Sequence, residues 1–368
     1  MTKQGYFTNE EIVLLDWIQG KITRPNEAFS IEKAHLFALK NGLSPYLFHR
    51  IKDNKEIIPD ELYPILKKDY FNALFRNTRI QNVWKEIQEL LNAHHLSFVP
   101  LKGIFLAQYI YPDFNTRPMS DLDILIMYGQ AQQAFDLLVS KGAQHSGEKQ
   151  AAHDKKTGHH LPGIIFKGVL IELHTSLFPL DVDYQIPNDL IEKSLIKYDN
   201  VFTLPPMLNF CYLCMHAYST MRRGGIRLSW FLDLVLLSQS EYFKADKLEL
   251  TKIIQQLNIQ VPVLDVMKKA EFLFDYRFEF VPKSLQGSLS TTESSVFVRL
   301  IQESGQQNTD YSYAIAFERL KNTKGLGNKL RFIKSVLLRG DNTRVTSLIK
   351  RLWTVTTRSF RMFLSKSR

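Results

Sequence analysis

Apolar residues recur at three- and four-residue intervals through the first 95 positions, which is the spacing of amphipathic helices. Thr8 followed by Glu11 forms a capping-box pattern ahead of an apolar run, so a helix is expected to begin there. The helical spacing extends furthest from Pro59 to about His95, where it fits one long helix or a broken pair. Residues 1–95 are therefore predicted to form an N-terminal helical region.

Between residues 96 and 180 the pattern changes to short runs of the kind that form strands. Strands are predicted at 96–101, 121–127 and 164–174, and an amphipathic helix at 131–142. Gly168 divides the last of these runs and is placed to turn it back on itself as a hairpin. The alternation of strands and helices indicates an α/β core over residues 96–180.

Helical spacing returns over residues 181–325, which are predicted to form a C-terminal helical domain. The final stretch, 326–368, keeps roughly helical apolar spacing with Lys and Arg alongside, and is predicted to form a basic amphipathic helical tail. The chain as a whole is thus expected to be an α+β protein. It would hold a small mixed sheet flanked by N- and C-terminal helical regions.

The charge of the chain is unevenly distributed. Of its 368 residues 45% are apolar and 23% charged, a balance typical of globular proteins that excludes a disordered or collagen-like chain. The net charge is +10, but 13 Lys and Arg and a single acid lie between Lys321 and Arg368, so the rest is close to neutral. A positive tail suggests an anionic partner: nucleic acid, an anionic membrane surface or an acidic protein patch.

The cellular location is suggested by three further features. No apolar run reaches the length of a transmembrane helix, and the first residues lack the apolar segment of a secretory signal. Cys211 and Cys214 have redox spacing but lie in an apolar, helix-like run, which favours a buried and reduced pair. A cytoplasmic location is expected, with peripheral membrane contact left open.

The strongest chemical signal is the stretch SDLDILI. Side chains alternate along a strand, so Asp121 and Asp123 are expected to share one face while Leu122 points to the other. Glu172, in the later run VLIELH, also points away from its apolar neighbours. If the two strands are adjacent, three carboxylates converge, and such a cluster favours Mg²⁺ together with substrate phosphates. The alternative is that these acids are solvated strand or turn residues.

Two cations and a glycine precede the acidic stretch. Lys102 and Gly103 end one predicted strand and open a short helix, whose free N–H groups suit a phosphate. Arg117 lies four residues before Asp121 and could bind a pair of phosphate oxygens. Lys102 and Arg117 could equally be surface cations or partners of the aspartates.

Taken together, these motifs resemble the uncharacterised nucleotidyltransferase family, within the polymerase β-like nucleotidyltransferase superfamily. The resemblance covers about residues 70–240 and implies a nucleotidyltransferase-type sheet. It also implies an NTP, expected to be ATP, with Mg²⁺ or Mn²⁺, and transfer of a nucleoside monophosphate to an unidentified acceptor hydroxyl. The matching positions are Leu101-Lys102-Gly103, Tyr111-Pro112, Arg117, Asp121, Asp123, Glu172 and His174, together with the stretch GHHLP at 158–162 and, in a later helical segment, His216, Arg227, Trp230 and Asp233.

Roles can be carried over to these positions as expectations. Metal binding and catalysis are assigned to Asp121, Asp123 and Glu172, and nucleotide binding to Lys102, Gly103, Arg117 and His160. Supporting places around the metal or in an acceptor cleft are assigned to His174, His216 and Arg227, each of which also fits a buried structural role. In one departure, Gly103 is followed by Ile104, where the superfamily usually has Ser or Gly. This keeps open a non-catalytic nucleotide-binding or regulatory module, tethered to a membrane or partner by its basic tail.

Overall fold

The computed structural model describes residues 3–147, 159–179, 182, 184–222, 225–243 and 247–303. The predicted basic tail, residues 326–368, lies outside these ranges. The chain divides into two compact units, one formed by residues 1–218 and 227–301, the other by residues 219–226 and 302–368. All the described strands and the candidate site belong to the first unit.

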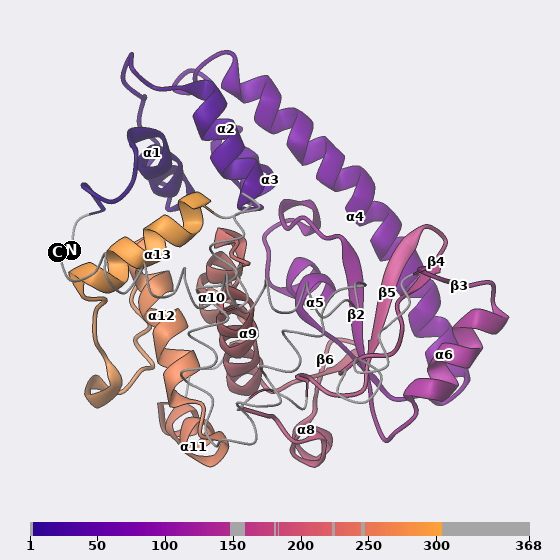
Figure 1. Ribbon diagram of the computed structural model, residues 1–368. Helices are drawn as coiled ribbons and strands as arrows, with labels where there is room; N and C mark the ends of the chain where they lie inside the picture. Colours follow the sequence, from indigo (N-terminus) through magenta and orange to yellow (C-terminus); the bar gives the residue numbers. More distant parts are fainter. Residues whose placement is uncertain are drawn as a thin grey trace, which may run out of the picture. The chain divides into compact units, whose positions relative to one another are not determined.

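Four helices build the N-terminal part of the first unit (Figure 1). They are α1 (Asn9–Ile18), α2 (Ile31–Lys40), α3 (Ser44–Ile51) and α4 (Leu62–Ala93). The predicted capping box is present on α1: the Glu11 N–H donates to Thr8 Oγ1 at 3.3 Å, and the Thr8 N–H donates to Glu11 Oε2 at 2.9 Å. The long periodic stretch forms a single helix, α4, rather than a broken pair.

Five strands form one mixed sheet in the order β1-β2-β5-β4-β3. They are β1 (Phe98–Pro100), β2 (Asp121–Ile126), β3 (Gln144–His145), β4 (Ile164–Phe166) and β5 (Val169–His174). Strands β2 and β5 run parallel, whereas the other neighbouring pairs are antiparallel. The predicted hairpin is β4–β5, and Lys167 and Gly168 in its turn have φ values of +49° and +76°, as two-residue hairpin turns require.

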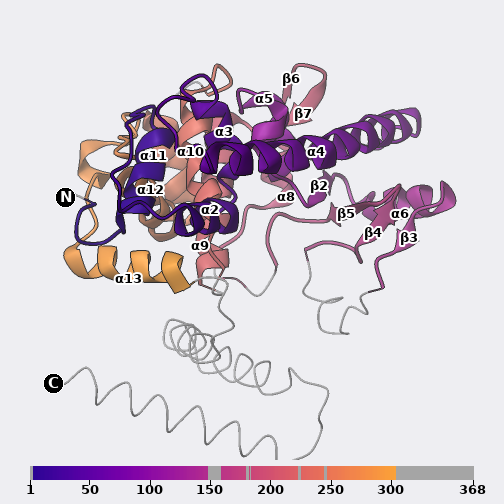
Figure 2. The same ribbon diagram turned by 90° about the horizontal axis from the view of Figure 1, so that it is seen from above.

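One face of this sheet packs against α4 and α6 (Ala131–Ser140) around an apolar core. The views agree that β4, β5 and α6 lie beside the same end of α4 (Figures 1 and 2). Trp84 of α4 is fully buried in this core. The strand residues in it alternate along β2 and β5: Leu122, Ile124, Ile126, Val169, Ile171 and Leu173. The intervening residues of both strands therefore point to the opposite face.

The remaining elements are mainly helical, with one hairpin. They are α5 (Lys102–Tyr109), η1 (Phe114–Thr116), α8 (Asn188–Ser194), β6 (Ile196–Tyr198), β7 (Val201–Thr203), α9 (Pro206–Met221), α10 (Leu228–Gln239), α11 (Lys247–Leu257), α12 (Gln260–Phe274), η2 (Lys283–Leu285) and α13 (Thr291–Glu303). Helices around a mixed sheet confirm the predicted α+β class. Among the described residues, no helix combines the length and apolarity needed to cross a bilayer.

The hairpin β6–β7 departs from the helical spacing predicted after residue 181. Its turn contains Asp199 at a φ of +53°, a conformation that Asp tolerates better than most residues. The ring of Tyr198 packs edge-on against Tyr242, 4.9 Å between centroids. Turn chemistry and tertiary contact decide this segment, and neither is visible in the periodicity of a few apolar residues.

Candidate metal centre

The register of β2 and β5 brings an aspartate and a glutamate side by side. Asp123 stands directly opposite Glu172 across the parallel pair, and His174 lies two residues further on the same face of β5. The His174 Nε2 atom lies 2.7 Å from Asp123 Oδ1 and 3.8 Å from Glu172 Oε2. One possible ligand atom from each of these three residues lies within 4.8 Å of the others. This set, which we call the Asp-Glu-His cluster, could hold a metal ion.

Asp121 lies on the same face, two residues before Asp123, but is not a member of the cluster. Its Oδ1 atom accepts a hydrogen bond from Ser120 Oγ at 3.3 Å. Burial and the neighbouring carboxylate of Asp123 raise the pKa of Asp121 above its ordinary value. His174, expected in a supporting place, comes within ligand distance of Asp123 and Glu172, and Asp121 lies beside this cluster on the same face, so its place as a metal ligand stays a prediction.

Asp123 is buried, and two hydrogen-bond donors at one of its oxygens compensate its negative charge. Lys102 Nζ donates to Asp123 Oδ1 at 3.1 Å, and His174 Nε2 meets the same atom. Burial alone would raise the pKa of Asp123, but the Lys102 ammonium and His174 together hold it far below its usual range. Lys102 therefore acts as the counter-ion of the Asp123 carboxylate.

The turn before α5 is tied to the same strand. The Leu101 N–H donates to the Asp123 carbonyl at 3.1 Å, and Lys102 follows with a φ of +40°, a conformation uncommon outside glycine. This backbone shape directs the Lys102 side chain to Asp123 and leaves the first turn of α5 beside the Asp-Glu-His cluster. No side chain caps that helix end, so its N–H groups keep the capacity to bind an anion.

Three histidines gather next to Glu172. The rings of His159, His160 and His174 have centroids 4.9 to 5.6 Å apart. Backbone bonds from Leu161 N to Leu173 O and from Thr175 N to His159 O hold the segment against β5. Burial and Asp123 raise the pKa of Glu172, while His160 lowers it. His160 thus lies close enough to Glu172 to lower its pKa, and His159 packs beside both other histidines.

Arg117 forms a buried fork with a helix far along the chain. Its Nε and Nη2 atoms each donate to a carboxylate oxygen of Asp233 on α10 at 2.8 Å, and Tyr111 OH donates to Asp233 Oδ1 at 2.7 Å. The third nitrogen, Nη1, lies 3.2 Å from the place a Cβ on Gly103 would take. Arg117, which was expected to bind phosphate, therefore uses two of its three nitrogens to bind Asp233. Because residue 103 is a glycine, the third nitrogen can approach the turn before α5.

Two helices contribute the remaining candidates. The structure places the His216 ring 5.8 Å from Trp230, between α9 and α10, and Arg227 in an exposed position at the N-cap of α10. Neither belongs to the Asp-Glu-His cluster, so their assignment to an acceptor cleft stays a prediction. Cys211 and Cys214 are buried with reduced thiols, and burial raises the pKa of both, which confirms a core role.

Sequence reasoning missed Tyr212 of α9. Its ring packs on Phe178, and its buried hydroxyl lies close enough to Lys102 and Asp123 for their charges to affect its pKa, which burial raises. Lys102 lies close enough to the Tyr212 hydroxyl to lower its pKa, whereas His174 Nδ1 is one of the buried side-chain atoms that lack a hydrogen-bond partner among the described residues. Tyr212 sits in an apolar run, so no local signal singles it out.

Comparison with known proteins places the chain in a family. Residues 28–275 match the family described as uncharacterised nucleotidyltransferase, and the chain therefore belongs to it. Searches of curated proteins and of solved structures each found no match.

Proposed function

We propose that this protein transfers a nucleoside monophosphate from an NTP, with ATP as the expected donor, to the hydroxyl of an acceptor and releases pyrophosphate. The observation that carries the proposal is the pairing of Asp123 with Glu172 across parallel strands, within ligand distance of His174 and beside an uncapped helix end. Membership of a nucleotidyltransferase family supports the same reaction class.

The residues present fit a divalent cation. Two carboxylates and an imidazole offer oxygen and nitrogen ligands, burial lowers the pKa of His174 and so favours the neutral ring that a metal needs, and Asp121 adds a third carboxylate nearby. Mn²⁺ suits the mixed oxygen and nitrogen donors, and Mg²⁺ suits the carboxylate oxygens. When bound, such an ion would neutralise triphosphate charge and polarise the attacked phosphorus.

The chain's own groups would complete the site. Free N–H groups at the start of α5 and the Lys102 ammonium would bind the triphosphate oxygens, since both lie next to Asp123. Arg117, anchored on Asp233, would support the turn at Gly103 from behind. Glu172, with its raised pKa, would accept the proton of the acceptor hydroxyl.

Transfer of label from ATP tests this function. The purified chain is incubated with a cell extract and Mg²⁺ or Mn²⁺, and with ATP labelled at either the α- or the γ-phosphate. We expect covalent α-label on an extract component, no γ-label, and loss of labelling in Asp123→Asn and in Glu172→Gln. An exposed-site variant, Asp189→Asn, should label normally. Transfer of γ-label, or α-labelling that persists in both site variants, would overturn the proposal.

A second candidate is a nucleotide-binding module without transfer activity. It is favoured by the Lys102 and His174 contacts, which satisfy Asp123 without any metal. Titration of ATP by calorimetry, with and without Mg²⁺, distinguishes the two candidates. Affinity that ignores Mg²⁺ and survives Asp121→Asn/Asp123→Asn favours the binding module, whereas Mg²⁺-dependent affinity that is lost in this variant favours the transferase.

A further inference from the structure

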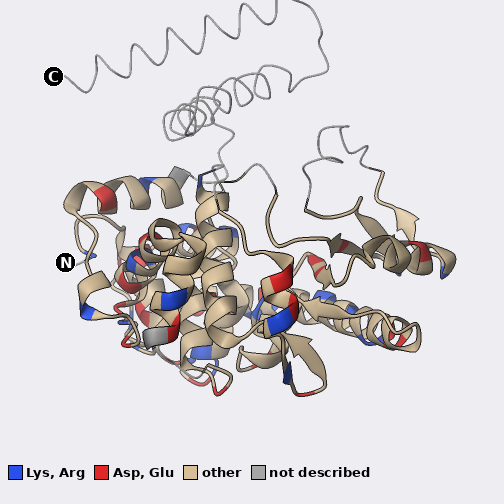
Figure 3. Ribbon diagram, turned by 90° about the horizontal axis from the view of Figure 1, so that it is seen from below, with Lys and Arg blue, Asp and Glu red and all other residues tan. Residues whose placement is uncertain are grey.

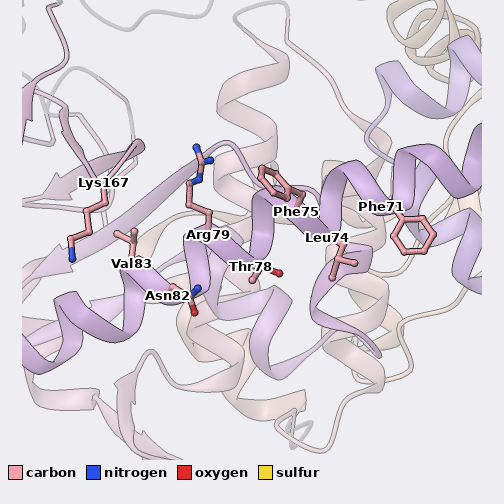
Figure 4. Close-up of a pocket in the computed structure, with 8 residues that line it drawn as sticks. All are labelled: Phe71, Leu74, Phe75, Thr78, Arg79, Asn82, Val83 and Lys167. Carbon is pink, nitrogen blue, oxygen red and sulfur yellow. The ribbon is translucent and has the colours of Figure 1, made fainter.

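A groove runs along the outer side of α4, on the side of the sheet away from the Asp-Glu-His cluster. It has a volume of about 700 Å³ and ends at the turn of the β4–β5 hairpin (Figure 4). Its lining comes from α4 with one residue of the hairpin: Phe71, Leu74, Phe75, Thr78, Arg79, Asn82, Val83 and Lys167. The groove is therefore separate from the site proposed to bind ATP.

Two phenylalanine rings lie open to water in this groove. Phe71 is 50% exposed and Phe75 is 72% exposed, one helical turn apart on the same side of α4. The opposite side of the helix, with Ile80 and Trp84, is buried in the core. Neither ring belongs to this core, and Phe71 contacts only the Tyr70 ring edge-on among the described aromatic residues, 5.7 Å between centroids. Two exposed aromatic rings at this spacing suit a flat ligand.

The cations around these rings are available to an anion. Arg79 stacks its guanidinium 5.6 Å from the Phe75 ring centroid, is exposed, and has no ion-pair partner among the described residues. Lys67 and Lys68, one turn before Phe71, are exposed as well. Lys and Arg positions recur along the α4 ribbon (Figure 3).

The acids nearby are already occupied. The Asp69 carboxylate accepts hydrogen bonds from His35 and Ser44 on the neighbouring helices, and Glu86 pairs with Lys167 at 2.6 Å. The free charge beside the exposed rings is therefore positive. Thr78 and Asn82 add exposed polar groups on the same stretch of helix.

We propose that this groove binds a single strand of nucleic acid, with bases stacked on Phe71 and Phe75 and a phosphate held by Arg79. Aromatic faces interleaved with cations are how proteins bind single strands without reading a sequence. Thr78, Arg79 and Asn82 line the groove beside the rings, and these groups can form hydrogen bonds with the phosphates and base edges of a strand. The proposal does not depend on nucleotide transfer at the Asp-Glu-His cluster.

Photo-crosslinking locates the strand on the full-length chain. A single strand of about 20 nucleotides carrying 5-iodouracil is irradiated with the protein, and the crosslinked tryptic peptides are identified by mass spectrometry. Trypsin cuts after Lys68 and Arg76, so both rings fall in one peptide, residues 69–76. We expect the crosslink there. Crosslinks confined to other peptides, including those from the basic stretch after Lys321, would overturn the proposal.

Fluorescence anisotropy with the same strand measures the energetic contribution. Phe75→Ala should weaken binding about five- to hundredfold at raised salt, because stacking of one base contributes on that order. Arg79→Gln should lower the slope of log affinity against log salt by about 0.7, as expected for one phosphate contact on a single strand. Phe202→Ala, at an exposed phenylalanine on β7 that is 52% accessible, is the control and should bind normally.

Other occupants give different results. Because both rings are exposed, Phe75→Ala should keep its melting temperature, so loss of binding cannot arise from unfolding. Unchanged strand affinity in Phe75→Ala would overturn the proposal. Loss of co-sedimentation with anionic phosphatidylserine vesicles in the same variant, with strand binding intact, would reassign the groove to a lipid surface.

Discussion

Replacing Lys102 with Met should separate two effects of its ammonium group. In the structure this group lies 3.1 Å from Asp123 Oδ1 and compensates a buried carboxylate. A divalent cation at the Asp-Glu-His cluster would share Asp123 with it and be repelled by it. The Met variant keeps most of the side-chain volume and removes only the charge. We therefore expect a lower free energy of unfolding without metal, a higher affinity for metal and a lower affinity for ATP.

The size of the effect follows from burial. The side chains of Lys102 and Asp123 are 16% and 8% exposed, so this pair lies between a surface ion pair and a fully buried one. Hydrogen bonds to charged groups contribute about 1.5–3 kcal/mol, and loss of one partner of a buried pair costs about 3–5 kcal/mol. Because His174 still forms a hydrogen bond with Asp123, we expect the free energy of unfolding to fall by an amount near the lower of these values, about 2 kcal/mol.

The free energy of unfolding that the metal-free variant loses should be regained when a metal ion binds, and so should raise the metal affinity. If a bound cation replaces the lost compensation, about 2 kcal/mol of destabilisation in the metal-free state becomes a gain of roughly 30-fold in Mn²⁺ affinity. Calorimetric titration with Mn²⁺ measures this gain, and urea denaturation with and without Mn²⁺ measures the two stabilities. Lys193→Met, which breaks an exposed pair with Asp189 at 3.5 Å, is the control and should change neither quantity noticeably.

The reasoning fails if Lys102→Met leaves Mn²⁺ affinity unchanged or lowers it. Either result would mean that Lys102 and the cation do not compete for Asp123. ATP affinity in the presence of Mn²⁺ is read separately, because the ammonium is also proposed to bind the triphosphate. Unchanged ATP affinity would remove Lys102 from the proposed nucleotide contacts while leaving the metal prediction intact.

Three further predictions concern stability and pH. Asp233→Ala leaves the buried Arg117 cation without its partner and should cost about 3–5 kcal/mol in urea denaturation; a loss below about 1 kcal/mol would contradict this. Burial and Asp123 raise the pKa of Glu172, so its ionisation destabilises the metal-free fold as pH rises. The rise in melting temperature caused by Mn²⁺ should therefore be smallest at acid pH and grow as Glu172 ionises, whereas a pH-independent rise would count against Glu172 as a ligand. Thr8→Ala removes the N-cap of α1 and should cost about 1 kcal/mol of unfolding free energy, measured in urea, whereas Asn9→Ala at the next, exposed position should cost clearly less.

Local patterns in the sequence were enough to predict much of the site. Side chains alternate along any strand, so SDLDILI alone put Asp121 and Asp123 on one face, and VLIELH put Glu172 and His174 on one face. Turn and cap residues likewise predicted the start of α1 and the β4–β5 hairpin. These features depend on residues within a few positions of one another in the chain, so they can be predicted from a single sequence.

The contacts that join distant segments were decided only by the tertiary structure. Arg117 looked like a phosphate ligand, but Asp233 lies 116 positions away, and no local pattern could indicate that the two would form a buried fork. The same holds for the register of β2 against β5, which brings His174 within ligand distance of Asp123 and Glu172. Periodicity in the chain determines which way a side chain points, because it follows from backbone geometry. Which side chain it meets depends on packing and desolvation summed over the whole fold.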